Sequence, residues 1–87
     1  LTGANLHKAH LNGAILTSAN LTEVDLTEAD LSSEFTFITN LYKANLNSAN
    51  LSDANLFKAD IRSSIQSNLF LCRTKMPDGV INNTNCK

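Results

Sequence analysis

The sequence predicts a solenoid, a repeat architecture in which short coils of the chain stack on one another. Leucine occupies every fifth position from Leu1 to Leu56, with one exception at Thr36. A small residue precedes most of these leucines by two positions, and asparagine or aspartate precedes most of them by one. A helix has a period near 3.6 and a strand a period of 2, so this period fits neither. A fixed short period that includes one large and one small apolar position is typical of stacked coils.

The two apolar positions of each unit predict which side chains form the interior. Val24 replaces the usual alanine once, and Glu34 and Thr39 are the unusual members. Large and small apolar side chains together fill a narrow interior, so we expect leucine and alanine to point inward. We expect the Asn/Asp position and the two variable positions to face water, with Asn and Asp favouring a bend. The alanines concerned are Ala4, Ala9, Ala14, Ala19, Ala29, Ala44, Ala49, Ala54 and Ala59.

This unit resembles the repeat of the pentapeptide repeat family. The segments Ala19-Asn20-Leu21-Thr22-Glu23 and Ala29-Asp30-Leu31-Ser32-Ser33 show the match, which covers roughly residues 1 to 71. The resemblance implies an all-β fold, a right-handed quadrilateral β-helix in which four units form one coil. Each coil would then hold roughly twenty residues and lie ~4.8 Å from the next, and about three and a half coils would be present.

That geometry predicts which residues lie above one another, since residues twenty positions apart would stack. We expect the interior leucines to form four columns, the last of them broken by Thr36. The predicted columns are Leu1, Leu21, Leu41 and Ile61; Leu6, Leu26 and Leu46; Leu11, Leu31 and Leu51; and Leu16 with Leu56.

The pattern fails between Leu31 and Leu41. Strict register would place Glu34 and Thr36 inside, and burying an unpaired carboxylate is too costly. A local slip resolves this conflict: a four-residue unit followed by a six-residue unit restores the register at Leu41. We therefore expect a bulge with Phe35 pointing inward.

The same slip would leave apolar side chains outside. Phe37, with Ile38, would stand on the same outer side as Phe57. One interpretation is a surface that binds a partner protein; the other is a bulge that packs its own aromatic residues, because isolated exposed apolar residues are common.

The end of the chain has a different character. A solenoid exposes unpaired backbone and apolar interior at its last coil and needs a cover. We expect residues 1–71 to form the repeat domain and residues 72–87 to form a C-terminal cap, in which Pro77-Asp78-Gly79 forms a turn. The segment from Leu71 to Gly79, with the later Cys86, also resembles the tail of pentapeptide repeat proteins of cyanobacteria and of the chloroplast thylakoid lumen.

Both cysteines lie in this predicted cap. A Cys72–Cys86 disulfide would close a loop and stabilise the fold by ~3 kcal/mol, and we favour that interpretation. The alternative is a pair of reduced thiols in a cytosolic protein, since two cysteines do not establish an oxidising compartment. His7 and His10 lie close together, but two imidazoles without a third ligand make a poor metal site, so we expect no metal and no cofactor.

Charge and membrane signals point to no specific partner. The formal net charge is −1, which provides neither a basic field for nucleic acid nor an acidic block. No apolar run approaches the ~20 residues that cross a bilayer. The chain begins at Leu1 in mid-pattern, without methionine, as a processed precursor or a fragment would.

These observations lead to a functional hypothesis. No catalytic constellation emerges, because the serines are scattered over variable positions and no histidine follows His10, so we expect no enzyme and no small-molecule substrate. We expect a structural or protein-binding module with an unknown protein partner, present as a monomer or a weak end-to-end dimer, in the thylakoid lumen or periplasm, or alternatively in the cytoplasm. The alternative function is that of a DNA mimic that regulates a type II topoisomerase (DNA gyrase), a role that calls for a longer and more acidic rod. Nucleic acid itself is not an expected partner.

Overall fold

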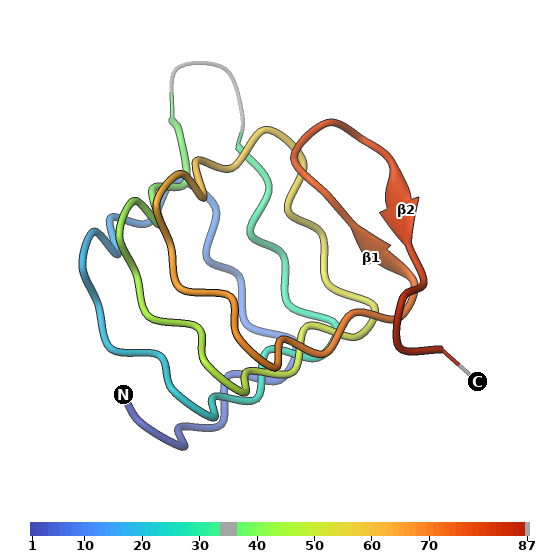
Figure 1. Cartoon of the computed structure of the whole chain (residues 1–87). Coiled ribbons are helices and arrows are strands. Elements are labelled where there is room, and N and C mark those ends of the chain that lie inside the picture. Colours follow the sequence, from blue (N-terminus) through green and yellow to red (C-terminus); the bar gives the residue numbers. More distant parts are fainter. Residues whose placement is uncertain (34–36, 87) are drawn as a thin grey trace.

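The computed structural model describes residues 1–33 and 37–86, and Figure 1 shows the chain winding through successive coils from the N-terminus to a short hairpin at the C-terminus. Among the described residues, the strands are β1 (Thr74–Lys75) and β2 (Ile81–Asn82), which pair antiparallel. Elsewhere the coils are joined by isolated parallel bridges, one residue on each side of a coil. The fold is therefore all-β, although long strands are absent from the described part.

A tight turn ends each five-residue unit. In the turn from Leu6 to Ala9, the Ala9 N–H donates to the Leu6 carbonyl over 3.0 Å, and Lys8 has a φ of 62°. A positive φ at the third turn residue, after a negative one at the second, is the signature of a type II turn. The same position has positive φ in most other units, occupied by Ser, Glu, Lys, Asp, Asn, Arg or Gly. The second variable position of the repeat therefore forms the corner of the coil.

The Asn/Asp position of the unit has a specific role at this corner. The Asn45 Oδ1 accepts a hydrogen bond from the backbone N–H of Asn47, two residues ahead, over 3.0 Å. The same bond forms from Asp25 to Thr27 and from Asp30 to Ser32, where the hydroxyl donates as well. Most of these side chains are half-buried rather than fully exposed to water, and they accept the hydrogen bonds that hold each bend in place, which confirms the predicted preference of Asn and Asp for the bend.

The aspartates at this position make stability sensitive to acid. The hydroxyl and the backbone N–H of Thr27 hold the pKa of Asp25 below its ordinary value. Burial raises the pKa of Asp30 and the bonds from Ser32 lower it, with a net lowering. A carboxyl group whose pKa is lower in the folded state stabilises the fold above its unfolded pKa of about 4, and that contribution disappears as the pH falls through the folded pKa.

We therefore expect the free energy of unfolding to fall as the pH drops below about 4, and to fall less in the Asp25→Asn/Asp30→Asn variant. An amide oxygen accepts the same bonds without titrating, as Asn45 does. Urea denaturation between about pH 5 and pH 2 measures the difference. Equal acid sensitivity of the two proteins would contradict the role assigned to these carboxylates.

The interior is built as the repeat predicts. The leucines of the central coils, the alanines two positions before them and Val24 are buried in one continuous core. At the N-terminal end Leu6, Leu11 and Leu16 are only partly buried against that core. The inward assignment of leucine and alanine is confirmed.

The stacking register differs from the predicted one across the segment that departs from the pattern. Asn5 bridges Asp25, a spacing of twenty, but Ile15 bridges Asn40, a spacing of twenty-five. Asn40 bridges Asp60, which returns to a spacing of twenty. The register of the described residues therefore gains five positions between Ser33 and Thr39, and we call the five sequence positions 34–38 that account for this gain the insertion. The columns read from the hydrogen bonds are Leu1, Leu21 and Leu46; Leu6, Leu26, Leu51 and Leu71; Leu11, Leu31, Leu56 and Met76; and Leu16, Leu41 and Ile61.

The predicted columns that pair Leu21 with Leu41, Leu26 with Leu46, Leu31 with Leu51 and Leu16 with Leu56 are accordingly wrong. The predicted slip, a four-residue unit followed by a six-residue unit, would keep the spacing between coils at twenty residues. The observed spacing of twenty-five corresponds to one additional unit of five residues, and the repeat continues unchanged on both sides. The expectations for Glu34, Phe35 and Thr36 lie outside the described residues.

Two hydroxyl groups join the chain at the base of the insertion. The Ser33 Oγ accepts from the Thr39 N–H over 2.9 Å and lies 3.0 Å from the Lys58 carbonyl, to which it donates. The Thr39 Oγ1 accepts from the Gly13 N–H over 2.8 Å and donates to the Ser32 carbonyl. Thr39 thus occupies the small-residue position of the next unit and is fully buried. Its hydroxyl lies between the Gly13 N–H and the Ser32 carbonyl, two backbone groups that would pair directly in a regular coil.

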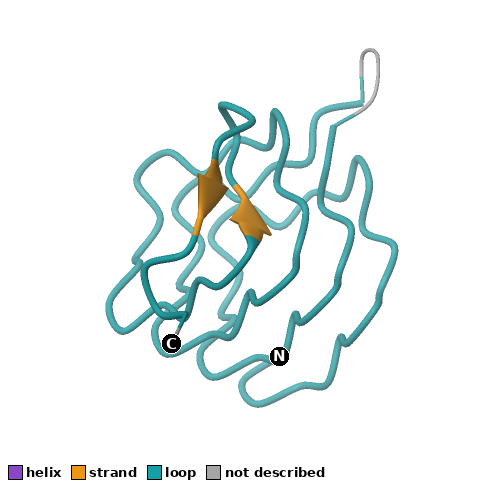
Figure 2. Ribbon diagram, turned by 90° about the vertical axis from the view of Figure 1, so that its right-hand side faces the viewer, coloured by secondary structure: helices purple, strands orange, loops and turns teal. Residues whose placement is uncertain are grey.

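The stacking of coils continues beyond the predicted boundary at residue 71. Asn55 bridges Lys75, and the Lys58 N–H donates to the Pro77 carbonyl over 2.9 Å. The chain then turns: the Gly79 N–H donates to the Met76 carbonyl, which confirms the predicted turn at Pro77-Asp78-Gly79. Figure 2 views this end of the molecule, with β1 and β2 in front of the coils. The division into domains at residues 71 and 72 stays a prediction.

Candidate functional site

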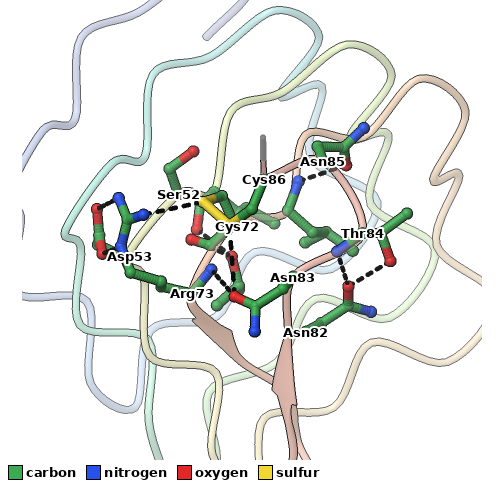
Figure 3. The surroundings of a disulfide bond; sticks show 12 residues. Ser52, Asp53, Cys72, Arg73, Asn82, Asn83, Thr84, Asn85 and Cys86 are labelled. Atoms are coloured by element: carbon green, nitrogen blue, oxygen red, sulfur yellow. Dashed lines mark hydrogen bonds and ion pairs between the residues drawn. A yellow bond between two sulfur atoms is a disulfide. The ribbon is translucent and has the colours of Figure 1, made fainter.

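A disulfide fastens the C-terminal tail to the last coil. Cys72 and Cys86 are bonded in the structure, and Cys72 is buried (Figure 3). Two asparagine side chains between these cysteines replace the carbonyl groups that a further coil would supply. The Asn85 Oδ1 accepts from the Leu71 N–H over 2.8 Å, and the Asn83 Oδ1 accepts from the Arg73 N–H over 2.9 Å. The tail therefore caps this side of the solenoid by satisfying its backbone.

Arg73 forms an ion pair beside this disulfide. Its Nε lies 2.7 Å from Asp53 Oδ1 and its Nη2 lies 3.0 Å from Oδ2, a two-pronged contact between neighbouring coils that Figure 3 shows. The hydrogen bond from Arg73 lowers the pKa of Asp53, and the same bond raises the pKa of Arg73. The pair is exposed, so we assign it a part in the orientation of Arg73 rather than a large share of stability.

The first predicted partner-surface residues follow directly after the part of the insertion that is not described. Phe37 is 69% exposed and Ile38 is 47% exposed. A Cβ atom added at Gly13, where φ is +73°, would lie 3.0 Å from the Phe37 Cβ. Phe37 therefore lies against the backbone of the first coil, at a position where only glycine combines the required φ with enough space.

Phe57, the third predicted surface residue, has a different environment. It is half-buried, with Lys58 Nζ 5.3 Å and Lys75 Nζ 5.0 Å from the centre of its ring. A Cβ atom added at Gly79 would lie 3.3 Å from its Cε1. Phe37 thus packs toward the N-terminal coil and Phe57 packs toward the C-terminal turn. That all three residues form one partner surface stays a prediction.

His7 contributes side-chain contacts between coils. The Nδ1 of His7 lies 2.7 Å from the Thr27 Oγ1, and its Nε2 lies 3.5 Å from Glu28. Within residues 1–33 and 37–86, no group of three or more His, Cys, Asp or Glu side chains is arranged to hold a metal ion.

The structure also contains a groove that sequence reasoning missed. It has a volume of about 580 Å³ and lies at the C-terminal end, between one side of the third coil and the hairpin. The apolar pair Val80-Ile81, directly after the turn, was the available signal, because two large aliphatic residues in a short polar tail need a place to pack. Its lining residues are Ile61, Met76, Pro77, Asp78, Val80, Ile81, Asn82 and Asn83.

No helix in the described part of the chain is long and apolar enough to cross a membrane. No curated protein matches the chain. Among solved structures, the chain is similar to HetL, a pentapeptide repeat protein involved in heterocyst differentiation regulation from the cyanobacterium Nostoc sp. strain PCC 7120. The two share 29% identity with a TM-score of 0.27, over 94% of this chain and 40% of HetL, so the chain spans less than half of the length of HetL.

The family comparison agrees with the register of the coils. Eight copies of the pentapeptide repeat match residues 1–33 and 39–65, well over half of the chain. The gap between these two segments lies where the spacing of the bridges changes from twenty to twenty-five. The chain belongs to the pentapeptide repeat family, whose repeats form an all-β, right-handed β-helix.

Proposed function

We propose that this chain is a non-catalytic protein-binding solenoid that presents a partner surface consisting of Phe37, Ile38 and Phe57. The observation that carries the proposal is the exposure of two adjacent large apolar residues, Phe37 and Ile38, at the place where the chain departs from the repeat. Exposed apolar groups that lie together mark interaction sites more often than isolated ones do. Members of the pentapeptide repeat family are generally not enzymes.

The base of the insertion supports this proposal because it is held in place. Ser33 and Thr39 are buried and hydrogen-bonded to each other, and Thr39 is bonded to Gly13 in the coil below. A surface supported by a rigid scaffold loses little conformational entropy when it binds. The coils would therefore serve as the support and the apolar side chains as the contacts.

Charge favours a protein partner over the alternative role of a DNA mimic. The net charge of −1 provides little of the negative field by which a mimic would compete with DNA. Near Phe57, Lys58 and Lys75 place two cations beside an aromatic ring, which suits acidic groups on a partner. In a gyrase supercoiling assay we therefore expect no inhibition, and tight inhibition would reverse this preference.

The disulfide is the basis of the proposed location. Disulfides persist in oxidising compartments, so we place the protein in the thylakoid lumen or the periplasm rather than the cytoplasm, as a monomer or a weak end-to-end dimer. Alkylation of thiols at the moment of cell lysis, followed by mass spectrometry, tests the location. Two alkylated cysteines would contradict it.

Affinity capture from a native extract tests the partner surface. We expect Phe37→Ser/Ile38→Ser and Phe37→Ser/Phe57→Ser to recover at least about tenfold less of the specific partner than the unmodified chain does, as for loss of a central apolar contact. Ile15→Ser is the matched control, because Ile15 is 82% exposed and lies outside the proposed surface. Equal recovery by all four proteins, each shown to be folded by circular dichroism, would refute the proposal.

A further inference from the structure

The C-terminal end of the solenoid has one side with an open backbone edge beside the groove. In every lower coil this side is paired: the Leu41 N–H donates to the Asp60 carbonyl, and the Lys43 N–H donates to the Arg62 carbonyl. In the next coil, Ile61 and Ser63 occupy the positions of Leu41 and Lys43, so their N–H groups are the corresponding donors. Within residues 1–33 and 37–86, no group accepts from either of them.

The matching acceptor is open as well. The Thr39 carbonyl accepts from the Asp60 N–H over 2.9 Å, and Ala59 occupies the equivalent position one level higher. No donor from the described ranges reaches the Ala59 carbonyl. Two donors and one acceptor therefore line one side of the coil in the order that a parallel extended segment pairs with.

The tail closes two sides of the same end, at Leu71 and at Met76, but not this one. The side chains of Asn83 and Asn85 accept from Arg73 and Leu71, and β2 pairs with β1. The hairpin leaves the coil at Pro77, after its last stacking bond to Lys58. The open side lies where a further unit would have continued the coil, and the hairpin forms one wall of the space.

The groove at this place selects a large apolar side chain. Ile61 is the last residue of the column that contains Leu16 and Leu41, and it lies in the groove together with Met76 and Val80. A side chain placed above Ile61 by the backbone pairing would continue this column. The small-residue column, two positions earlier in each unit, consists of Ala14, Thr39 and Ala59. The residue of the bound segment that lies above Ala59 must therefore be small.

We propose that this edge, consisting of residues 59–63 and the groove beside them, binds an extended segment of a partner polypeptide by parallel strand addition. The segment has the sequence small residue, any residue, large aliphatic residue, any residue. The N–H of its second residue donates to the Ala59 carbonyl, and the carbonyl of that residue accepts from the Ile61 N–H. The carbonyl of its fourth residue accepts from the Ser63 N–H. The side chain of its third residue fills the groove. Strand addition of this kind takes affinity from the backbone and specificity from the pocket. The site shares no residue with the proposed partner surface of Phe37, Ile38 and Phe57, and it does not depend on the proposed function.

An acetylated, amidated peptide with the sequence of residues 44–53 serves as the probe, because it carries this pattern twice. In titrations followed by ¹H–¹⁵N NMR, we expect a Kd in the range of about 0.1–1 mM and hydrogen exchange of the Ile61 and Ser63 amides slowed at least about tenfold at saturation. A peptide N-methylated at the second residue of both copies of the pattern lacks the donor to Ala59 in either register and should bind about tenfold more weakly. A peptide with asparagine in place of both leucines should also lose binding, because neither copy of the pattern then has a third side chain that fits the groove.

A pair of protein variants locates the binding site. Val80→Lys places a charge in the groove wall and should weaken binding at least about tenfold, whereas Ile15→Lys at the opposite end should leave it unchanged. Weakening by Ile15→Lys alone, or equal binding of the N-methylated peptide, would overturn the proposal. Protection of the same two amides without peptide, together with dimers in sedimentation, would assign the edge to a second copy of the chain and overturn the partner assignment.

Discussion

Replacement of Leu46 by alanine is expected to lower the free energy of unfolding by about 2–5 kcal/mol, measured by urea denaturation followed by circular dichroism. Leu46 is buried in the middle of the solenoid, above Leu21 in the column that begins at Leu1. The coils above and below are held at a fixed spacing by backbone bonds, so the surrounding structure has little freedom to collapse into the space that the side chain leaves. The loss therefore includes both the transfer free energy of the removed atoms and the cavity that remains.

Leu1→Ala is the matched control, because Leu1 stands in the same column but its side chain is 64% exposed. We expect this variant to lose less than about 1 kcal/mol. A loss smaller than about 0.5 kcal/mol for Leu46→Ala would contradict the role of the leucine columns as the main stabilising element.

Reduction of the Cys72–Cys86 disulfide is expected to lower the free energy of unfolding by about 3 kcal/mol, since the bond closes a loop with a sequence separation of 14. The effect extends to the cap, because Asn83 and Asn85 reach the last coil from within this loop. We expect reduction also to speed hydrogen exchange of the Leu71 and Arg73 amides, whose acceptors are these two asparagines.

Urea denaturation with and without dithiothreitol measures this effect. The Cys72→Ala/Cys86→Ala variant is the control: it should match the reduced protein and should not respond to the reductant. A denaturation midpoint that reduction leaves unchanged would show that the tail is held by its hydrogen bonds and packing alone.

Much of the fold could be predicted from the sequence because the repeat is strict. The period of five identifies the residues that point inward, and leucine columns such as Leu26 above Leu6 follow from it directly. The turn at Pro77-Asp78-Gly79 was equally predictable, because the preferences of proline and glycine are local properties of the backbone.

The register across the insertion could not be predicted in this way. A slip within the coil and an insertion of a whole unit both restore the leucine period at Leu41, so the spacing of leucines does not distinguish them. The bridge from Ile15 to Asn40 and the hydrogen bond between Gly13 and Thr39 decide between them, and those contacts join residues from different coils.

Some features of the fold and of the candidate sites could be predicted from the sequence, and others required the tertiary structure. Sequence alone determined the solenoid, its inward leucines and alanines, and the two places where the pattern changes, because each unit repeats the same local chemistry. Only the tertiary structure decided which coil lies above which, how far the tail covers the last coil, and that the edge at Ile61 remains open beside a groove. The physical reason is that stacking, capping and open edges depend on backbone groups meeting across coils, and every residue has the same backbone donor and acceptor whatever its side chain.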